Sequence, residues 1–165
     1  MNDREQGFTD YFASKSGAMR GTAYLLCGDW HRAEDLVQNA FVKLYRAWHR
    51  IAAHETLDAY TRQILVRTYL DENRRGFFYR EKPTADQADR TAPPVGSSED
   101  RLVLLRALTK VPPRQRAVLV LRFWEDMSVE DTARAMGCTA GTVKSQTARG
   151  LDALREYVAT TTFIS

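Results

Sequence analysis

Near the carboxyl end of the sequence, the segment GTVKSQTARGLDALRE places two cations on one side of a helix and apolar residues on the other. At about 100° per residue, Lys144, Ser145 and Arg149 share a face with small residues, and Val143 and Leu151 lie behind them. The apolar side can dock on a neighbouring helix. On the opposite side, small residues allow close approach, and the two cations can reach phosphates or base edges.

Signals for two helices and a short turn surround this segment. Ser128 followed by Asp131 is a capping-box-like start, which predicts a helix beginning at Val129. Gly137 should end that helix, and Thr139 is a suitable N-cap for the next one. Two helices joined by a glycine-containing turn, the second with a cationic outer face, are typical of a DNA-reading helix-turn-helix. A helical hairpin with solvated charges explains the periodicity equally well, because exposed helices ordinarily carry charge.

The composition bounds the class of protein. The chain has 165 residues, of which 44% are hydrophobic, enough for one ordinary globular domain or two small ones. A net charge of +3 permits an acidic partner without requiring one. No apolar run approaches the roughly 20 residues of a membrane span, and the N-terminus MNDREQGFTDYF is unlike a signal peptide. Two cysteines do not make a disulfide framework, so a cytoplasmic location is expected.

The hydropathy pattern divides the chain into three segments. Residues 1–80 and 99–165 have helical periodicity, the latter interrupted at Pro112 and Pro113, which end one helix and can open the next. Residues 81–98 hold three of the five prolines and no aromatic residue, which predicts a flexible linker. No run alternates at period two for long enough to be a strand. The predicted fold is therefore all-α, with two small helical domains joined by that linker.

Three apolar stripes define the helices expected in the first domain. The first stripe consists of Phe8, Phe12, Met19, Ala23 and Leu26; the second of Ala33, Leu36, Val37, Ala40, Phe41, Leu44 and Trp48; and the third of Leu57, Tyr60, Ile64, Leu65 and Thr68. A small bundle of three or four helices follows from this pattern.

Longer stretches of the sequence carry a family resemblance. ALTKVPPRQRAVLVLRFWEDMSVEDTARAMGCTAGTVKSQTARGLDALRE closely resembles the promoter-binding fourth region of bacterial sigma factors of the extracytoplasmic-function group. In the first domain, DWHRAEDLVQNAFVKLYRAW resembles the second-region helix that grips the polymerase clamp, and LDAYTRQILVRTYLDENRR resembles the helix that reads the minus-ten element. The matches occur in the right order with a linker between them. Within the group, the sequence is most similar to the actinobacterial sigma-E-type subfamily.

The resemblance implies a function and partners. It implies a sigma factor that binds core RNA polymerase and directs promoter-specific initiation by reading the minus-ten and minus-thirty-five elements of promoter DNA. No enzymatic activity, cofactor or metal is implied. The habit of the group, together with the lack of a sensory segment in this chain, adds an anti-sigma factor as an expected partner.

The resemblance also assigns residues to three contacts. The core-polymerase contact would consist of Asp35, Gln38, Asn39 and Arg46. The minus-thirty-five contact would consist of Thr139, Lys144, Ser145, Gln146 and Arg149. The minus-ten contact would consist of Arg62, Arg67, Arg74 and Arg75, with residues 49–57 as the loop that captures a flipped base. Four positions depart from the common pattern of relatives: Asn39 replaces a glutamate, Arg67 an asparagine, Gln146 an arginine and Ala148 a larger residue.

Two alternatives from other classes use only half of the chain. A stand-alone helix-turn-helix regulator would need the second domain alone, but such repressors are dimeric and no heptad segment is present. A helical protein-interaction module would need the first domain alone. Common nucleotide-binding, hydrolase and protease motifs are missing, which argues against an enzyme. Cys27 and His31 supply only two of the four ligands of a usual zinc site, so no metal site is expected.

Overall fold

The computed structural model describes residues 2–51, 57–79 and 99–164, which are helical almost throughout. No strand occurs within these ranges, and the predicted all-α class is confirmed. The predicted linker, residues 81–98, lies outside them. The elements are α1 (Asp3–Cys27), α2 (Trp30–Ile51), α3 (Leu57–Tyr79), α4 (Glu99–Thr109), α5 (Pro113–Leu119), the π-helical segment η1 (Val120–Trp124), α6 (Val129–Met136) and α7 (Ala140–Ile164).

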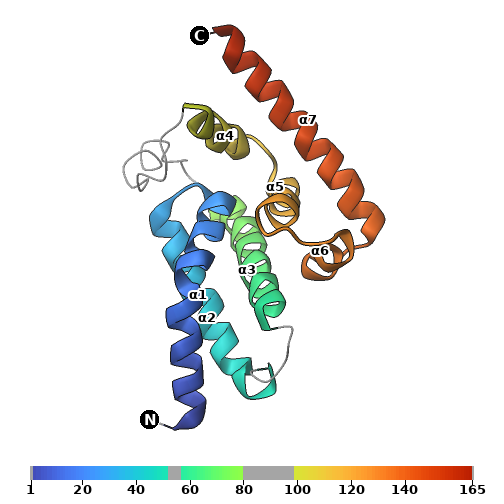
Figure 1. Cartoon of the computed structure of the whole chain (residues 1–165). Coiled ribbons are helices and arrows are strands. Elements are labelled where there is room, and N and C mark those ends of the chain that lie inside the picture. The colour runs from blue at the N-terminus through green and yellow to red at the C-terminus, as the bar shows by residue number, and fades with distance from the viewer. Residues whose placement is uncertain (1, 52–56, 80–98, 165) are drawn as a thin grey trace.

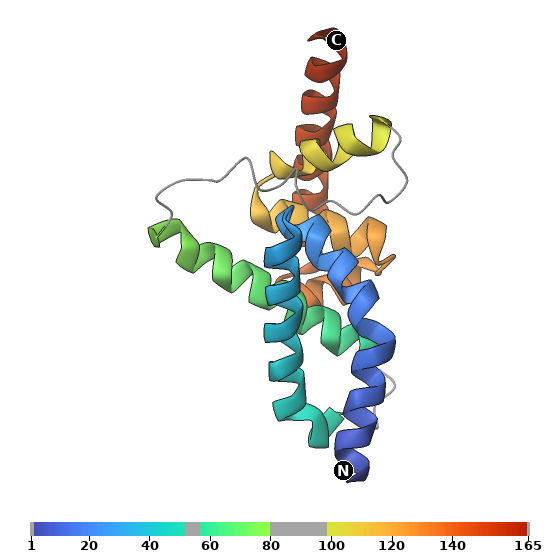
Figure 2. The ribbon, with the colours of Figure 1, turned by 90° about the vertical axis from the view of Figure 1, so that its left-hand side faces the viewer.

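The first domain begins with two long helices, α1 and α2, that run side by side (Figures 1 and 2). Gly28 ends α1 with a φ of 80°, in the left-handed region that glycine adopts without strain, and its N–H donates to the carbonyl oxygen of Tyr24 at 2.7 Å. Every residue of the apolar stripe predicted for α2, from Ala33 to Trp48, is buried. This part of the core was predicted correctly.

The stripes predicted for α1 and α3 are only partly correct. On α1, Phe12 is 38% exposed and lies at the margin of the core, edge-on against the ring of Phe41 at 4.9 Å between centroids. On α3, Tyr60 is half-buried, whereas Val66 and Tyr69, which the stripe omitted, are buried. The buried face of α3 differs from the predicted one because the second domain packs against this helix as well.

The caps predicted in the second domain are confirmed. Pro113 occupies the first turn of α5. The hydroxyl of Ser128 accepts a hydrogen bond from the Asp131 N–H at 3.0 Å, so α6 begins at Val129. Gly137 ends α6 with a φ of 67°. α7 then continues as a long helix that projects beyond α4 (Figure 1).

The two domains pack against each other. α6 lies against α3, and buried residues of both domains, Val66 and Ala135 among them, belong to one continuous apolar core. Arg116 of α5 reaches into the first domain, where it is 5% exposed and its Nε donates to the carbonyl oxygen of Leu25 at 2.6 Å. Burial lowers the pKa of this guanidinium from its ordinary value. Sequence periodicity gave no indication of this interdomain contact.

Gly150 allows α7 to approach α5 closely. A Cβ atom at this position would lie 2.9 Å from Cδ1 and 3.1 Å from Cγ of Leu119, a buried side chain. Glycine in a helix interior costs stability, so its presence here is explained by this close approach.

We predict that Gly150→Ala lowers the free energy of unfolding by about 1–2 kcal/mol, because the cost of overpacking exceeds the gain in helix propensity. Gly17→Ala is the matched control: no atom lies within 4 Å of a Cβ there, so this variant should gain about 0.5–1 kcal/mol. Urea denaturation followed by circular dichroism measures both. Equal stabilisation by the two substitutions would contradict the close approach.

Candidate nucleic-acid and protein interfaces

The polar face of α2 carries the four residues assigned to polymerase binding. Asp35, Gln38, Asn39 and Arg46 are all exposed, on the side of the helix opposite the buried stripe. The structure therefore presents them together on one accessible surface.

Sequence reasoning missed the apolar part of this surface. Val42, 51% exposed, lies among the polar residues, and Phe12 and Tyr45 are exposed beside it. Together with Gln38 and Arg46 they line a groove of about 470 Å³ between α1 and α2. The signal for Val42 was present in the sequence, since it is an apolar residue outside the helical stripe. An apolar centre with a polar rim is the usual anatomy of a protein–protein interface.

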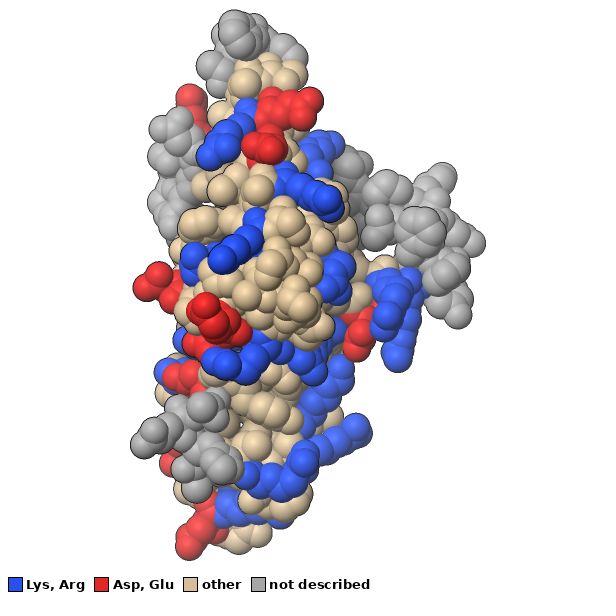
Figure 3. Space-filling view, turned by 90° about the vertical axis from the view of Figure 1, so that its right-hand side faces the viewer, with Lys and Arg blue, Asp and Glu red and all other residues tan. Residues whose placement is uncertain are grey.

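The outer face of α7 presents most of the residues assigned to the minus-thirty-five element. Lys144, Ser145 and Arg149 are exposed, and the Thr139 hydroxyl caps the helix by accepting from the Thr142 N–H at 3.1 Å. Gln146 differs: it is half-buried and lines a cleft of about 780 Å³ between the domains. On this side of the molecule, basic side chains are spread along the surface with acidic ones between them (Figure 3).

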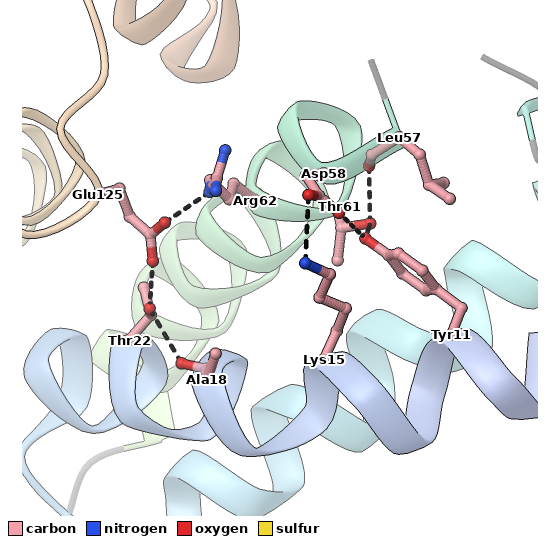
Figure 4. Close-up of polar contacts among 9 residues, drawn as sticks. All are labelled: Tyr11, Lys15, Ala18, Thr22, Leu57, Asp58, Thr61, Arg62 and Glu125. Atoms are coloured by element: carbon pink, nitrogen blue, oxygen red, sulfur yellow. Dashed lines mark hydrogen bonds and ion pairs between the residues drawn. The ribbon is translucent and has the colours of Figure 1, made fainter. Parts of the chain in front are cut away.

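Several of the arginines of α3 assigned to the minus-ten element already have partners within the protein. Arg62 pairs with Glu125, which follows η1: its Nε lies 2.5 Å from Oε2 of the carboxylate (Figure 4). The other oxygen, Oε1, accepts from the Thr22 hydroxyl of α1, also at 2.5 Å. The side chain of Glu125 is only 10% exposed, and that of Arg62 27%. We refer to Glu125, Arg62 and Thr22 together as the Glu125 bridge.

Arg67 is bound by the end of α6. Its Nε donates to the carbonyl oxygen of Ala135 and its Nη2 to that of Arg134, each at 3.0 Å. The last carbonyl groups of a helix lack intrahelical donors and lie at the negative end of its dipole, which suits a guanidinium. Arg74 pairs with Asp71 on α3 itself at 3.1 Å, and Arg75 is exposed.

The loop after η1 fixes the position of Glu125. The Glu125 N–H donates to the Val120 carbonyl oxygen, and the Met127 N–H donates to that of Leu121, each at 3.0 Å. Asp126 between them has a φ of 54°, a conformation that Asp and Asn tolerate better than most residues. No sequence pattern singled out Glu125, because a carboxylate in a loop is ordinarily solvated.

The first turn of α3 is anchored to α1 by a second polar group. The Tyr11 hydroxyl donates to Oδ1 of Asp58 at 2.7 Å, and Nζ of Lys15 lies 3.4 Å from the other carboxylate oxygen (Figure 4). The hydrogen bond from Tyr11, followed by the charge of Lys15, lowers the pKa of Asp58, and burial raises the pKa of Tyr11. Residues 52–56 of the expected base-capturing loop lie outside the described ranges.

The cysteines and histidines do not converge. Within the described residues, no group of three or more His, Cys, Asp or Glu side chains could hold a metal ion. Cys27 is half-buried, its Sγ donates to the Asp29 carbonyl oxygen, and burial raises the pKa of its thiol, as befits a core thiol. None of the helices in the described part of the chain is both long enough and apolar enough to span a bilayer.

Two family matches cover the two domains. Sigma-70 region 2 matches residues 12–76, and Sigma-70, region 4 matches residues 101–154. The RNA polymerase sigma-E factor of Streptomyces avermitilis is 39% identical over 150 residues, which cover 90% of this chain and 83% of the relative. The chain belongs to the sigma-70 family. It is an RNA polymerase sigma factor of the extracytoplasmic-function group, similar to the actinobacterial sigma-E factors.

Further relatives support the same assignment of the chain to this group of sigma factors. SigW of Bacillus subtilis, an extracytoplasmic-function sigma factor, is 29% identical over 93% of this chain and 92% of its own length. Among solved structures, the sigma factor RpoE in complex with the anti-sigma factor NepR, from Bartonella quintana, has a TM-score of 0.75 at 26% identity, covering 92% of this chain and 96% of that one. Because regions 2 and 4 are both present, the alternative of a stand-alone regulator is rejected, and the chain directs RNA polymerase to promoters.

Thr139 is the residue that orders the start of the minus-thirty-five candidate helix. We predict that Thr139→Ala costs about 1 kcal/mol of stability, because the Thr142 N–H loses its acceptor. Thr139→Ser keeps an acceptor oxygen, so the stability of this variant should stay close to that of the unsubstituted protein. Thermal unfolding followed by circular dichroism measures the difference, and equal losses in both variants would show that the hydroxyl is not the stabilising group.

Proposed function

We propose that this sigma factor divides its contacts among three helix faces, carried by a region 2 domain (residues 1–80) and a region 4 domain (residues 99–165) with residues 81–98 between them. The polar face of α2 binds core RNA polymerase, the outer face of α7 reads the minus-thirty-five element, and α3 reads the minus-ten element. The observation that carries the proposal is that two of these faces, on α2 and α7, remain exposed although the domains are packed together.

The α2 face has the chemistry of a protein-binding surface. Asp35 and Gln38 offer polar contacts at the rim, and Val42 supplies apolar area at the centre. These features support the assignment of Asp35, Gln38, Asn39 and Arg46 to core polymerase.

The α7 face has the chemistry of a groove-reading helix. Gly141 and Ala148 are exposed and small, so the backbone can approach DNA closely. Arg149 can donate two hydrogen bonds to a guanine edge, and Lys144 near the capped N-terminus suits a phosphate. Thr139 and Ser145 lie beside them, whereas Gln146 would have to leave the interdomain cleft to reach DNA.

The minus-ten assignment rests on the cations of α3. Arg62, Arg67, Arg74 and Arg75 all project from this helix, and guanidinium groups are well matched to phosphates and base edges. Because Arg62 and Arg67 contact the second domain here, promoter reading by α3 requires the domains to move apart.

The remaining partners follow from this division. The sigma factor acts in the cytoplasm together with core polymerase, which supplies the catalysis, and has no catalytic activity of its own. An anti-sigma factor that covers these faces would control it, and the likeness to a sigma factor solved with its anti-sigma factor supports this partner.

The polymerase contact is tested by reversing charge on α2. Asp35→Arg with Gln38→Ala leaves the buried stripe intact, so the fold should survive while binding to core polymerase in a pull-down, and with it transcription in vitro, is lost. Asp10→Arg on α1 is the control, an exposed acid on the side of that helix turned away from Phe8 and Phe12. Retention of core binding by the double variant would overturn the assignment.

The minus-thirty-five contact is tested by two substitutions on α7. Arg149→Ala should weaken holoenzyme binding to one class of minus-thirty-five sequence by the ~1–3 kcal/mol of a lost bidentate base contact. Lys144→Ala should weaken binding to all sequences alike and reduce the salt dependence by about one charge. Arg155 is another exposed arginine of α7, and it pairs with Asp152. Arg155→Ala should change neither the sequence preference nor the salt dependence of DNA binding. Loss of core binding by Arg149→Ala would contradict the division of faces.

A further inference from the structure

Tyr11 of α1 contacts both the end of α2 and the beginning of α3. Its ring packs against that of Trp48, in the last turn of α2, at 5.6 Å between centroids. Its hydroxyl donates to Oδ1 of Asp58, in the first turn of α3, at 2.7 Å, and lies 2.9 Å from Oγ1 of Thr61 (Figure 4). One side chain of α1 therefore fixes the end of α2 and the beginning of α3 relative to each other.

The hydrogen bond from Tyr11 to Asp58 is the strongest polar contact in this group. The hydrogen bond itself lowers the pKa of the Asp58 carboxyl group, so the acceptor is charged at neutral pH, and hydrogen bonds to a charged acceptor are stronger than those between neutral groups. Lys15, 3.4 Å from the other carboxylate oxygen, contributes less, because its side chain is 39% exposed and exposed ion pairs are weak. Thr61 is buried, and its hydroxyl donates to the Leu57 carbonyl oxygen at 2.9 Å.

The beginning of a helix is the part that most needs such a contact. The first four N–H groups of a helix lack acceptors within it, and helix ends open locally at little cost in free energy. The contacts of Tyr11 with Asp58 and Thr61 oppose this fraying in the first two turns of α3. Arg62, the first of the arginines assigned to the minus-ten element, follows Thr61 directly, so its backbone is held by the same contacts.

We propose that Tyr11 is a positioning residue for minus-ten recognition: from α1 it holds the first two turns of α3, and with them the backbone of Arg62, in the orientation in which α3 meets promoter DNA. The inference rests on the proposed role of α3 in reading the minus-ten element. Tyr11 acts through α3 and touches no DNA. Base contacts are directed hydrogen bonds, whereas phosphate contacts carry no sequence information, so a displaced helix loses discrimination between sequences more than it loses affinity.

The test uses reconstituted holoenzyme and two DNA probes. One is a promoter selected by the unsubstituted holoenzyme from a random-sequence library, and the other is the same promoter with its minus-ten element scrambled. The measured quantity is the ratio of the two dissociation constants. Tyr11→Phe keeps the ring against Trp48 and removes only the hydroxyl, so it should lower this ratio about fivefold, the factor that corresponds to one hydrogen bond of ordinary net strength. A loss of folded protein alone weakens binding to both probes alike and cancels in the ratio.

Three further variants test whether the hydrogen bond is the cause. Asp58→Ala removes the acceptor and should lower the ratio as Tyr11→Phe does, whereas Asp58→Asn keeps an oxygen for the Tyr11 hydroxyl and should preserve most of the ratio. Tyr11→Phe combined with Asp58→Ala should lower the ratio no further than either single variant, because both remove the same bond. Ser14→Ala is the matched control on α1: it removes an exposed hydroxyl that donates to the Tyr11 carbonyl oxygen within the helix, and should leave the ratio unchanged.

The outcomes distinguish this inference from the proposed function. A lower ratio in Tyr11→Phe and Asp58→Ala that is preserved in Asp58→Asn supports the positioning role. Equal weakening of both probes overturns it, because Tyr11 then serves only the stability of the domain. If Arg62→Ala lowers the ratio and Tyr11→Phe does not, the positioning role fails and the minus-ten role of α3 stands. If neither variant changes the ratio, the proposed base-reading role of Arg62 has failed, and the inference fails with it.

Discussion

The burial of α3 on two sides is the constraint on which the rest of the structure depends. This helix packs against α1 and α2 through one flank and against the region 4 domain through another. Val66 and Tyr69, which the predicted stripe omitted, are buried, whereas Leu57, Tyr60 and Ile64 of that stripe are only half-buried. Because this helix packs against both domains, two of its arginines, Arg62 and Arg67, bond to groups of the region 4 domain, whereas Arg74 and Arg75 are exposed.

The Glu125 bridge and Arg116 fix the relative orientation of the two packed domains. Apolar surface alone would allow the domains to slide, since burial is non-directional. Arg62 and Arg116 instead each meet one particular oxygen, on Glu125 and on Leu25, and these contacts fix how the region 4 domain lies on the first. The consequence for function is an asymmetry: the faces of α2 and α7 are available, whereas Arg62 and Arg67 of α3 are hydrogen-bonded to groups of the region 4 domain.

Local features of this fold were predictable from the sequence, and contacts between its domains were not. The caps at Ser128, Gly137 and Thr139 follow from short-range chemistry that involves neighbouring residues only. The stripe of α2 follows from helical periodicity. Glu125 could not be predicted in the same way, because its partners Arg62 and Thr22 are distant in the sequence and each would be an ordinary polar residue if solvated. Val42 lies between these cases, since its position off the stripe was visible but its place beside an apolar groove was not.

The packing of the two domains against each other is tested most directly by measuring the distance between them in the free chain. Spin labels at exposed Ser14 on α1 and Glu156 on α7, in a chain whose Cys27 and Cys138 are replaced by serine, can be followed by pulsed electron paramagnetic resonance. The closed arrangement predicts one narrow distance distribution at the separation seen in the structure, and a shift to another separation when core polymerase is added. A broad distribution in the free chain, without that peak, would contradict it.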